Sequence, residues 1–306
     1  MDIVVFDNVT KIFGKSKVIK ALDNASFRIP SKVVAGLLGP NGSGKTTSFK
    51  LIMGFLKPNS GKISVFGKDP WIDEYSVRRR IGYLPEKPVY PYVSVYKFLK
   101  HIGKMQGVDI REVERIIQLV GLEEYKFFNI RGLSRGYLQR LGLAQALIGD
   151  PELLLLDEPT ANLDPLSRKQ ILDLIKDLKK ELGITIIIAT HILPELQEVA
   201  DYVVYINKGR IIEAGKLEDL THKYFVHTYY YVETSDPRKL ASRIIMEEYV
   251  RGIEVRDNGL LIKINSAYKE DLLNILTSSE LSVYVKNIKH VTTELGELYE
   301  KLSRAS

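Results

Sequence analysis

The sequence has no cysteine and only one tryptophan and four methionines among its 306 residues. A chain without cysteine cannot form disulfides or thiolate metal sites. No apolar run approaches the roughly 18 residues that a membrane-spanning helix needs; Thr185–Ala189 is far too short. The first residues, Met1–Val5, begin acidic and lack the pattern of a signal peptide. These absences lead us to expect a cytoplasmic protein, or one bound peripherally to the inner face of the cell membrane.

Composition is that of an ordinary globular protein, with 45% hydrophobic and 27% charged residues. The length is sufficient for two domains. The net charge of +6 is a modest basic excess. Such an excess suits a nucleotide-handling protein or an anionic membrane surface, and we expect no direct contact with nucleic acid.

A glycine-rich stretch, Gly39–Thr46, is the most specific pattern in the chain. It matches the phosphate loop of nucleotide-binding proteins, follows a short apolar run and precedes a helical pattern. An ordinary glycine-rich turn would not need this strand-loop-helix context. Backbone N–H groups of such a loop bind phosphate, Lys45 reaches the outer phosphates and Thr46 can ligate Mg²⁺. The predicted ATP-binding residues here are Gly39, Pro40, Asn41, Gly42, Ser43, Gly44, Lys45, Thr46 and Thr47.

Two acids follow a second buried strand, which is formed by four consecutive leucines. With a phosphate loop nearby, Asp157 is predicted to hold Mg²⁺ and Glu158 to polarise the attacking water. The alternative is an acidic turn that caps a helix. His191 ends a third buried strand and is predicted to contact the same phosphate, although a lone histidine is often structural. Phe13 and Val18, upstream of the loop, are assigned to the ATP site; a ring at Phe13 can stack on adenine or simply fill the core.

The order of these motifs resembles the nucleotide-binding domain of ABC transporters, from residue 1 to about 220. The residues that carry the resemblance are Phe13, Gly39–Thr46, Glu86, Leu133–Tyr137, Leu153–Glu158, Asp164 and His191. The implied fold is an α/β P-loop NTPase core with an antiparallel β-subdomain and an α-helical subdomain at about 87–150. ATP and Mg²⁺ are the implied cofactors, and ATP hydrolysis is the implied activity.

Leu133–Gly136 is the most diagnostic part of the resemblance, because other P-loop families lack it. It implies a head-to-tail homodimer or heterodimer of ATPase subunits with ATP between them. Ser134 and Gly136 would then cap the phosphate held by the partner, since a helix N-terminus attracts anions. Asp164 is assigned to the same ATP site and is also a plausible helix N-cap.

The sequence departs from the family pattern at two places. Glu86 stands where the family usually has Gln, and we assign it both a catalytic role and a place among the Mg²⁺ ligands, with Thr46 and Asp157. Arg135 and Tyr137 replace the usual Gly and Gln, and we expect both side chains to face outward. Both departures resemble exporter ATPases whose membrane subunit is a separate chain.

Two domains are predicted, an ATPase domain at 1–222 and an accessory α+β domain at 223–306. The second has the order strand 229–233, helix 237–249, strands 253–256 and 260–264, helix 269–276, strand 283–286 and helix 293–302. This order suggests a ferredoxin-like sandwich. It has no concentration of catalytic residue types, so we expect regulation, dimer contact or partner docking.

The favoured hypothesis is the ATPase subunit of an ABC transporter of the exporter type, with a separate integral membrane permease docked near residues 87–110. A soluble ABC-type ATPase acting on a ribosome or nucleic-acid complex is the alternative, although such proteins carry two ATPase domains or a long coiled coil. A regulatory ATP binder whose turnover is impaired by Glu86 is a third hypothesis.

Overall fold

The computed structural model describes residues 2–14, 18–224, 227–256, 258–265, 268–278 and 281–291. The chain divides into two compact units, the first ending at Leu217 and the second beginning at Glu218. We describe each unit by itself.

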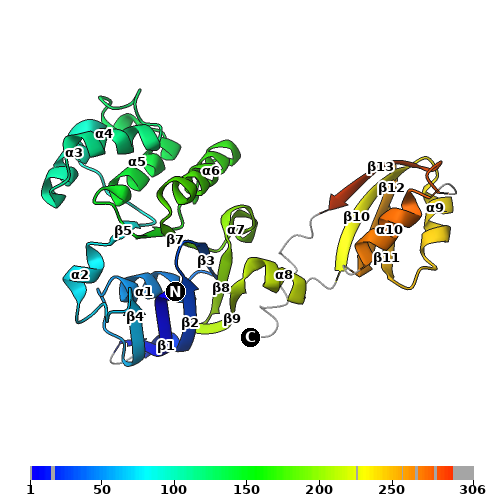
Figure 1. Ribbon diagram of the computed structural model, residues 1–306, viewed down its shortest axis with the longest axis horizontal. Coiled ribbons are helices and arrows are strands. Elements are labelled where there is room, and N and C mark those ends of the chain that lie inside the picture. Colours follow the sequence, from blue (N-terminus) through cyan, green and yellow to red (C-terminus); the bar gives the residue numbers. More distant parts are fainter. Residues whose placement is uncertain are drawn as a thin grey trace. The chain divides into compact units, whose positions relative to one another are not determined.

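A six-stranded sheet forms the centre of the first unit (Figure 1). Its strands, in spatial order, are β5 (Ile81–Leu84), β6 (Leu153–Asp157), β7 (Thr185–Thr190), β3 (Val34–Leu38), β8 (Tyr202–Asn207) and β9 (Arg210–Lys216). All neighbours are parallel except β8 and β9. Every residue of β3, β6 and β7 is buried, as the continuous apolar runs predict. The carboxyl ends of these three strands therefore meet at one edge.

A second, three-stranded antiparallel sheet has the order β2-β1-β4, from β1 (Asp2–Phe13), β2 (Ile19–Pro30) and β4 (Ser60–Val65). Phe6 and Phe27 stack across the strand pair with ring centroids 4.4 Å apart. In the sequence, apolar alternation covers only residues 3–9 and 26–29, so each strand extends well beyond its alternating residues at one end. Register shifts along the β1–β2 pair break the alternation that reveals a strand, while the pairing itself continues to Phe13 and Ile19.

The helices of the first unit are α1 (Lys45–Ile52), α2 (Glu74–Arg78), α3 (Val95–Gln106), α4 (Ile110–Leu119), α5 (Arg135–Leu147), α6 (Pro165–Leu182) and α7 (Leu193–Val199). Figure 1 shows α3, α4 and α5 as a separate group of helices. The helical apolar pattern of residues 95–122 is divided into two helices, because Gly107 ends α3 at φ 72° and Asp109 caps α4. The short helix α8 (Leu217–Tyr224) lies at the division between the units.

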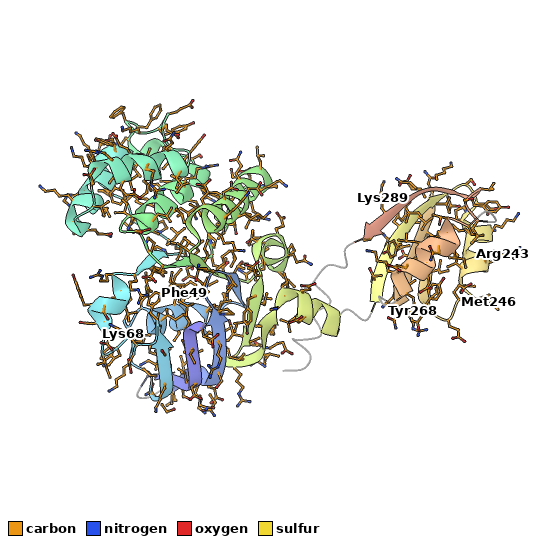
Figure 2. The ribbon with its side chains drawn as sticks, viewed as in Figure 1. Phe49, Lys68, Arg243, Met246, Tyr268 and Lys289 are labelled. Atoms are coloured by element: carbon orange, nitrogen blue, oxygen red, sulfur yellow. The ribbon has the colours of Figure 1, made fainter. Side chains whose placement is uncertain are left out.

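The second unit contains β10 (His227–Thr234), α9 (Pro237–Ile244), β11 (Val250–Arg256), β12 (Gly259–Asn265), α10 (Lys269–Leu276) and β13 (Val285–Val291). Its antiparallel sheet has the order β11-β12-β10-β13, as in a split βαβ sandwich. Helix α9 ends sooner than predicted, since buried Tyr249 stacks on Tyr268 at 5.5 Å instead of continuing the helix. The helix expected at 293–302 lies outside the described residues. Figure 2 shows Arg243 and Met246 at one edge of this unit.

The core of the first unit joins both sheets through α1. Phe49 of α1 is fully buried and meets Tyr83 of β5 edge-on, with ring centroids 6.3 Å apart (Figure 2). Leu155 lies in the middle of β6 and belongs to the same cluster. The strand that carries the acids Asp157 and Glu158 at its end is thus held by apolar contacts on both faces.

We predict that Leu155→Ala lowers the free energy of unfolding of the first unit by about 2–5 kcal/mol, because it leaves a cavity in this core. The only tryptophan, Trp71, lies in the first unit, so its fluorescence during urea denaturation reports on that unit alone. Leu166→Ala is the matched control, since Leu166 is 67% exposed. Equal stabilities of the two variants would contradict the prediction.

Candidate functional site

The phosphate loop joins the end of β3 to the start of α1. Gly44 has φ 118°, and a Cβ there would lie 2.5 Å from the carbonyl oxygen of Ala21. A Cβ on Gly39 would lie 2.1 Å from the carbonyl oxygen of Ile206. Both positions therefore require glycine, because backbone atoms cannot move aside. The glycines let the loop pack tightly against β2 and β8 while its N–H groups remain available to an anion.

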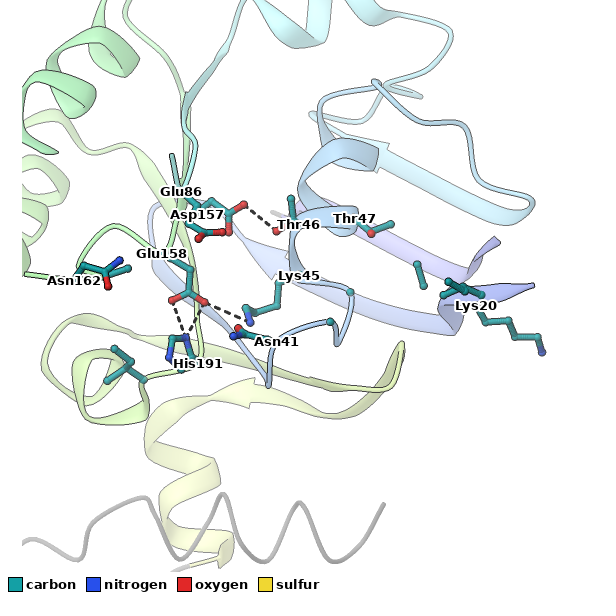
Figure 3. A pocket seen from close by; sticks show the side chains of 16 residues that line it. Lys20, Asn41, Lys45, Thr46, Thr47, Glu86, Asp157, Glu158, Asn162 and His191 are labelled. Atoms are coloured by element: carbon teal, nitrogen blue, oxygen red, sulfur yellow. Dashed lines mark hydrogen bonds and ion pairs between the residues drawn. The ribbon is translucent and has the colours of Figure 1, made fainter. Parts of the chain in front are cut away.

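Lys45 is the buried cation of this site, with 6% of the residue exposed. Its Nζ donates to the carbonyl oxygens of Gly39 at 2.7 Å and Pro40 at 3.3 Å, and lies 3.5 Å from Oε1 of Glu158. Burial lowers the pKa of Lys45, and the Glu158 carboxylate opposes that shift. The ammonium is thus held at the mouth of the loop, next to a carboxylate (Figure 3).

Asp157 ends β6 and contacts the first turn of α1. The Thr46 hydroxyl donates to Oδ2 of Asp157 at 3.0 Å. Burial raises the pKa of Asp157, while the hydrogen bond from Thr46 opposes the shift. A hydroxyl and a carboxylate are hard oxygen ligands of the kind that Mg²⁺ prefers, so this pair fits that ion. In the described part of the chain, no group of three His, Cys, Asp or Glu residues is placed to hold a metal ion by itself.

Glu158 and His191 come from the ends of neighbouring strands and touch each other. Nδ1 of His191 lies 3.0 Å from each carboxylate oxygen of Glu158 (Figure 3). Glu158 adopts φ 49°, a left-handed conformation that is uncommon for a residue with a side chain. Its N–H donates to the carbonyl oxygen of Ala189 at 2.8 Å. The strained backbone turns the carboxylate into the cavity, between Lys45 and His191.

A cavity of about 490 Å³ lies over these groups. The predicted residues that line it are Asn41, Gly42, Gly44, Lys45, Thr46, Thr47, Glu86, Asp157, Glu158 and His191. Its size falls in the range of small-molecule sites. The structure therefore brings together residues from the phosphate loop, the end of β5, the end of β6 and the end of β7.

Three residues of the loop support its shape without lining this cavity. Gly39 and Pro40 offer their carbonyl oxygens to Lys45. Ser43 is 3% exposed, and its hydroxyl has no hydrogen-bond partner within the described residues. An unpaired buried hydroxyl is costly to the folded chain.

Phe13 and Val18, the two residues assigned to the ATP site upstream of the loop, do not line the cavity found in the described part of the chain. Phe13 is 38% exposed and Val18 63% exposed, and neither lines the cavity formed by the described residues. Ile19, Lys20 and Ala21 of β2 line it instead, and were missed. The alternating pattern gave no sign of them, because their approach to the loop comes from the long antiparallel pairing of β1 and β2.

Glu86 lies at the rim of the cavity, directly after β5. Its side chain is 49% exposed and forms a 3.5 Å ion pair with Lys87. Burial is the main cause that raises the pKa of Asp157. The negative charges of Glu158 and Glu86 raise it further, each to a smaller extent. Glu86 is thus close enough to influence the acids electrostatically while remaining accessible to water.

The signature stretch Leu133–Tyr137 surrounds the start of α5. Ser134 caps this helix, accepting from the N–H of Tyr137 at 3.5 Å. Ser134 is exposed, and within the described residues Ser134, Gly136 and Asp164 do not line this chain's own cavity. Asp164 caps α6 by accepting from the N–H groups of Leu166 and Ser167, as predicted.

The two unusual signature residues differ in their surroundings. Arg135 is exposed and donates from Nη1 to the carbonyl oxygen of Asn162 at 3.2 Å. Tyr137 is half-buried, its ring 4.0 Å from that of Tyr125, so only Arg135 of the two faces outward. Asn162 itself lines the cavity and was missed by the sequence reading. Arg135 therefore ties the start of α5 to the loop beside the acids.

Comparison with known proteins assigns the class. A family model described as ABC transporter matches residues 22–161. The bacitracin transport ATP-binding protein BcrA of Bacillus licheniformis is 32% identical over 296 residues, which cover 92% of this chain and 94% of BcrA. YhcH, an ABC transporter ATP-binding protein of Bacillus subtilis, is 30% identical over 97% of this chain and 94% of its own length.

Solved structures agree. CbiO1 from Clostridium perfringens, part of the ABC transporter complex CbiONQ, has a TM-score of 0.67 at 31% identity and covers 80% of this chain and 96% of its own. The dimeric ATP-binding cassette MJ0796, bound to ADP and phosphate after hydrolysis, has a TM-score of 0.62 at 26% identity, covering 70% and 98%.

Fold and site together define a P-loop ATPase of the cassette type. The chain belongs to the ABC transporter family as one of its ATP-binding proteins. The α/β core, the antiparallel β-subdomain and the helical group predicted from the sequence are confirmed for residues up to Leu217. None of the described helices is both long and apolar enough to span a bilayer.

We predict that Lys45→Met weakens ATP binding by about 10- to 100-fold, because it removes a charged hydrogen-bond donor worth about 1.5–3 kcal/mol. Titration with a fluorescent ATP analogue measures the affinity. Lys50→Met is the control, since Lys50 lies on the same helix and is exposed. An affinity unchanged by Lys45→Met would remove this cation from the phosphate site.

Proposed function

We propose that the chain binds ATP with Mg²⁺ in the 490 Å³ cavity, hydrolyses it, and thereby drives export through a separate membrane subunit. The observation that carries the proposal is the Glu158 carboxylate, held between Lys45 and His191 at the end of β6 and beside the phosphate-binding loop. Each part of the cavity has a task in this reaction.

The loop and Lys45 bind the phosphates. ATP brings several negative charges to a place where N–H groups of the loop and the first turn of α1 converge. The Lys45 ammonium now donates to two carbonyl oxygens of the loop, and these bonds can be exchanged for bonds to phosphate oxygens. Ser43, whose hydroxyl has no partner among the described residues, is a further donor.

Thr46 and Asp157 are the residues that would hold Mg²⁺, which when bound neutralises charge on the phosphate oxygens. Their oxygens already lie 3.0 Å apart on two rigid elements, α1 and β6. Glu86 is proposed as an additional ligand and catalytic contributor at the rim. As a carboxylate it contributes charge that a glutamine would lack, so it fits best with the metal present.

Glu158 is the proposed general base, and His191 is proposed to hold Glu158 and to contact the phosphate. A base must lie within hydrogen-bond reach of the water whose proton it takes. The carboxylate of Glu158 faces the cavity from its strained backbone position, and His191 restrains both of its oxygens at 3.0 Å. We propose that the imidazole also contacts the terminal phosphate during hydrolysis.

A second ATPase subunit completes the site, as a homodimer or a heterodimer. Ser134 lies exposed at the N-terminus of α5 and does not line this chain's own cavity, given the residues described. Such a helix end attracts an anion, and ATP held on a partner subunit is the anion that we propose. Gly136 and Asp164 are assigned to the same interface. The dimeric state named for MJ0796 supports this arrangement.

We predict that Glu158→Gln lowers kcat for ATP hydrolysis by about 10²- to 10⁴-fold, as expected for the loss of a general base. Phosphate release from the purified full chain is the measurement. Glu152→Gln serves as the control, because Glu152 is an exposed residue at the other end of the same strand. Equal rates for Glu158→Gln and the unchanged chain would remove Glu158 from this role.

The same variant should hold ATP without hydrolysing it and so accumulate as a dimer. Gel filtration of Glu158→Gln with ATP and Mg²⁺ is expected to show twice the mass seen without nucleotide. Adding Ser134→Arg should abolish that shift, because a bulky cation would then occupy the capping position. A variant that stays monomeric at saturating ATP would count against the shared site.

A groove of about 800 Å³ is the proposed docking place for the membrane subunit. It lies among α2, β5, α3 and α5, and its lining includes Tyr75, Met105 and Gln106. Tyr75 is 80% and Met105 72% exposed, which leaves apolar surface for a partner. The groove adjoins β5, which ends two residues before Glu86, so docking there can affect the rim of the ATP cavity. We propose that the docked protein lies on the inner face of the membrane.

We predict that Met105→Cys forms a crosslink to a membrane-embedded chain when native membranes are treated with a short thiol-to-amine reagent. The chain has no other cysteine, so the site of reaction is unambiguous. Met246→Cys is the control, since Met246 is 82% exposed but lies in the second unit. Adducts of equal yield at both positions, or none at Met105, would contradict docking at this groove.

Residues 223–306 are proposed to form an accessory domain with a regulatory or docking role. The described part has its own apolar core, contributed by Leu240, Ile244, Ile262, Leu272 and Leu276 among others. Within the residues described, this domain has no group of three His, Asp or Glu residues placed to hold a metal ion.

A further inference from the structure

Glu195 is a buried acid close to the ATP cavity that hydrolysis, as proposed above, leaves without a task. It lies on α7, four residues after His191, and is 4% exposed. Glutamates are almost never buried this completely unless they are paired. Burial raises the pKa of Glu195, and the hydrogen bond from Thr160 opposes that shift. A costly group in this position calls for an explanation.

The carboxylate of Glu195 connects α7 with two other elements. The hydroxyl of Thr160, which is 1% exposed, donates to Oε2. Nε of Arg168 on α6 lies 3.2 Å from Oε1 and forms an ion pair. Thr160 belongs to the turn that begins at Glu158, in which the N–H of Ala161 donates to the Glu158 carbonyl oxygen at 3.1 Å.

The connection therefore runs between the two groups that meet in the cavity. On one side it holds the turn that carries Glu158, and on the other the helix that follows His191. The side chains of Glu158 and His191 contact each other at 3.0 Å. Glu158 is itself held in a left-handed backbone conformation, which persists only where surrounding contacts impose it.

We infer that Glu195 is a positioning residue for ATP hydrolysis, whose bond to Thr160 holds the Glu158 turn and the His191 segment in register. The inference rests on the roles proposed above for Glu158 and His191. Neither Glu195 nor Thr160 lines the ATP cavity found among the described residues, so they act through the residues that do. ATP binding, which depends on the phosphate loop, should be unaffected by this bond.

The first test is Thr160→Val, which removes the hydroxyl but keeps the shape of the side chain. We expect kcat to fall about 10- to 100-fold, because a displacement of about 1 Å at a catalytic group can cost that much. KM for ATP should stay within about threefold, since ground-state binding is untouched. Thr160→Ser, which restores the hydroxyl, should recover most of kcat.

Glu195→Met tests the other end of the bond. A methionine fills a similar volume, and replacing a buried charge by an apolar group is often neutral or stabilising. Arg168 is 37% exposed and can turn to water. We therefore expect a folded protein with a lower kcat. In the double variant with Thr160→Val, kcat should be no lower than in the worse single variant, because both changes break one bond.

Thr185→Val is the matched control. Thr185 is also buried, at 2% exposure, and its hydroxyl accepts from the N–H of Lys32 at 2.9 Å. It stands at the opposite end of β7 from His191. This variant should lose thermal stability to an extent similar to Thr160→Val, with kcat unchanged.

Several outcomes would overturn the inference. One is a kcat of Thr160→Val within about twofold of that of the unchanged chain. Another is a kcat of Thr160→Ser that stays as low as that of Thr160→Val. The third is a double variant in which the two losses of kcat multiply. If Glu195→Met does not fold, the comparison of valine and serine at 160 still decides. Loss of activity in Glu158→Gln together with full activity in Thr160→Val would remove this inference alone and leave the proposed function standing.

Discussion

The parallel alignment of β3, β6 and β7 is the constraint on which the rest of the structure depends. Because neighbouring parallel strands end at the same edge, Gly39, Asp157 and His191 emerge together although they are far apart in the chain. The three strands are buried at every residue, so the edge is rigid. The packed core therefore brings the side chains at this edge close to one another.

The charges at this edge are not balanced. Three carboxylates line the cavity, those of Glu86, Asp157 and Glu158, against two lysines, Lys20 and Lys45. The Lys45 ammonium lies 3.5 Å from Glu158. Adding the phosphates of ATP increases the negative charge further, which explains why a divalent cation fits the Thr46–Asp157 pair. Burial raises the pKa of Asp157 and lowers that of Lys45, so both groups gain from an opposite charge brought by the bound ligand.

Much of the fold was predictable from local pattern. Apolar runs identified the central strands, and glycine spacing identified the phosphate loop. Caps were readable as well, as Asp164 at the start of α6 illustrates. Prediction failed where local pattern and tertiary pairing diverge. The pairing of Phe13 with Ile19 extends β1 and β2 beyond their alternating residues, and Gly107 with Asp109 divides a continuous apolar periodicity into α3 and α4.

The chemistry of the ATP site was determined by the sequence alone, because Lys45, Thr46, Asp157 and Glu158 stand in patterns whose residue types have few other uses. Only the tertiary structure decided how those groups meet. It placed Glu158 at a positive φ against His191, brought Ile19–Ala21 to the cavity wall, and buried Glu195 between Thr160 and Arg168. The physical reason is that strand spacing and backbone conformation set these distances, and neither is encoded in any short stretch of residues.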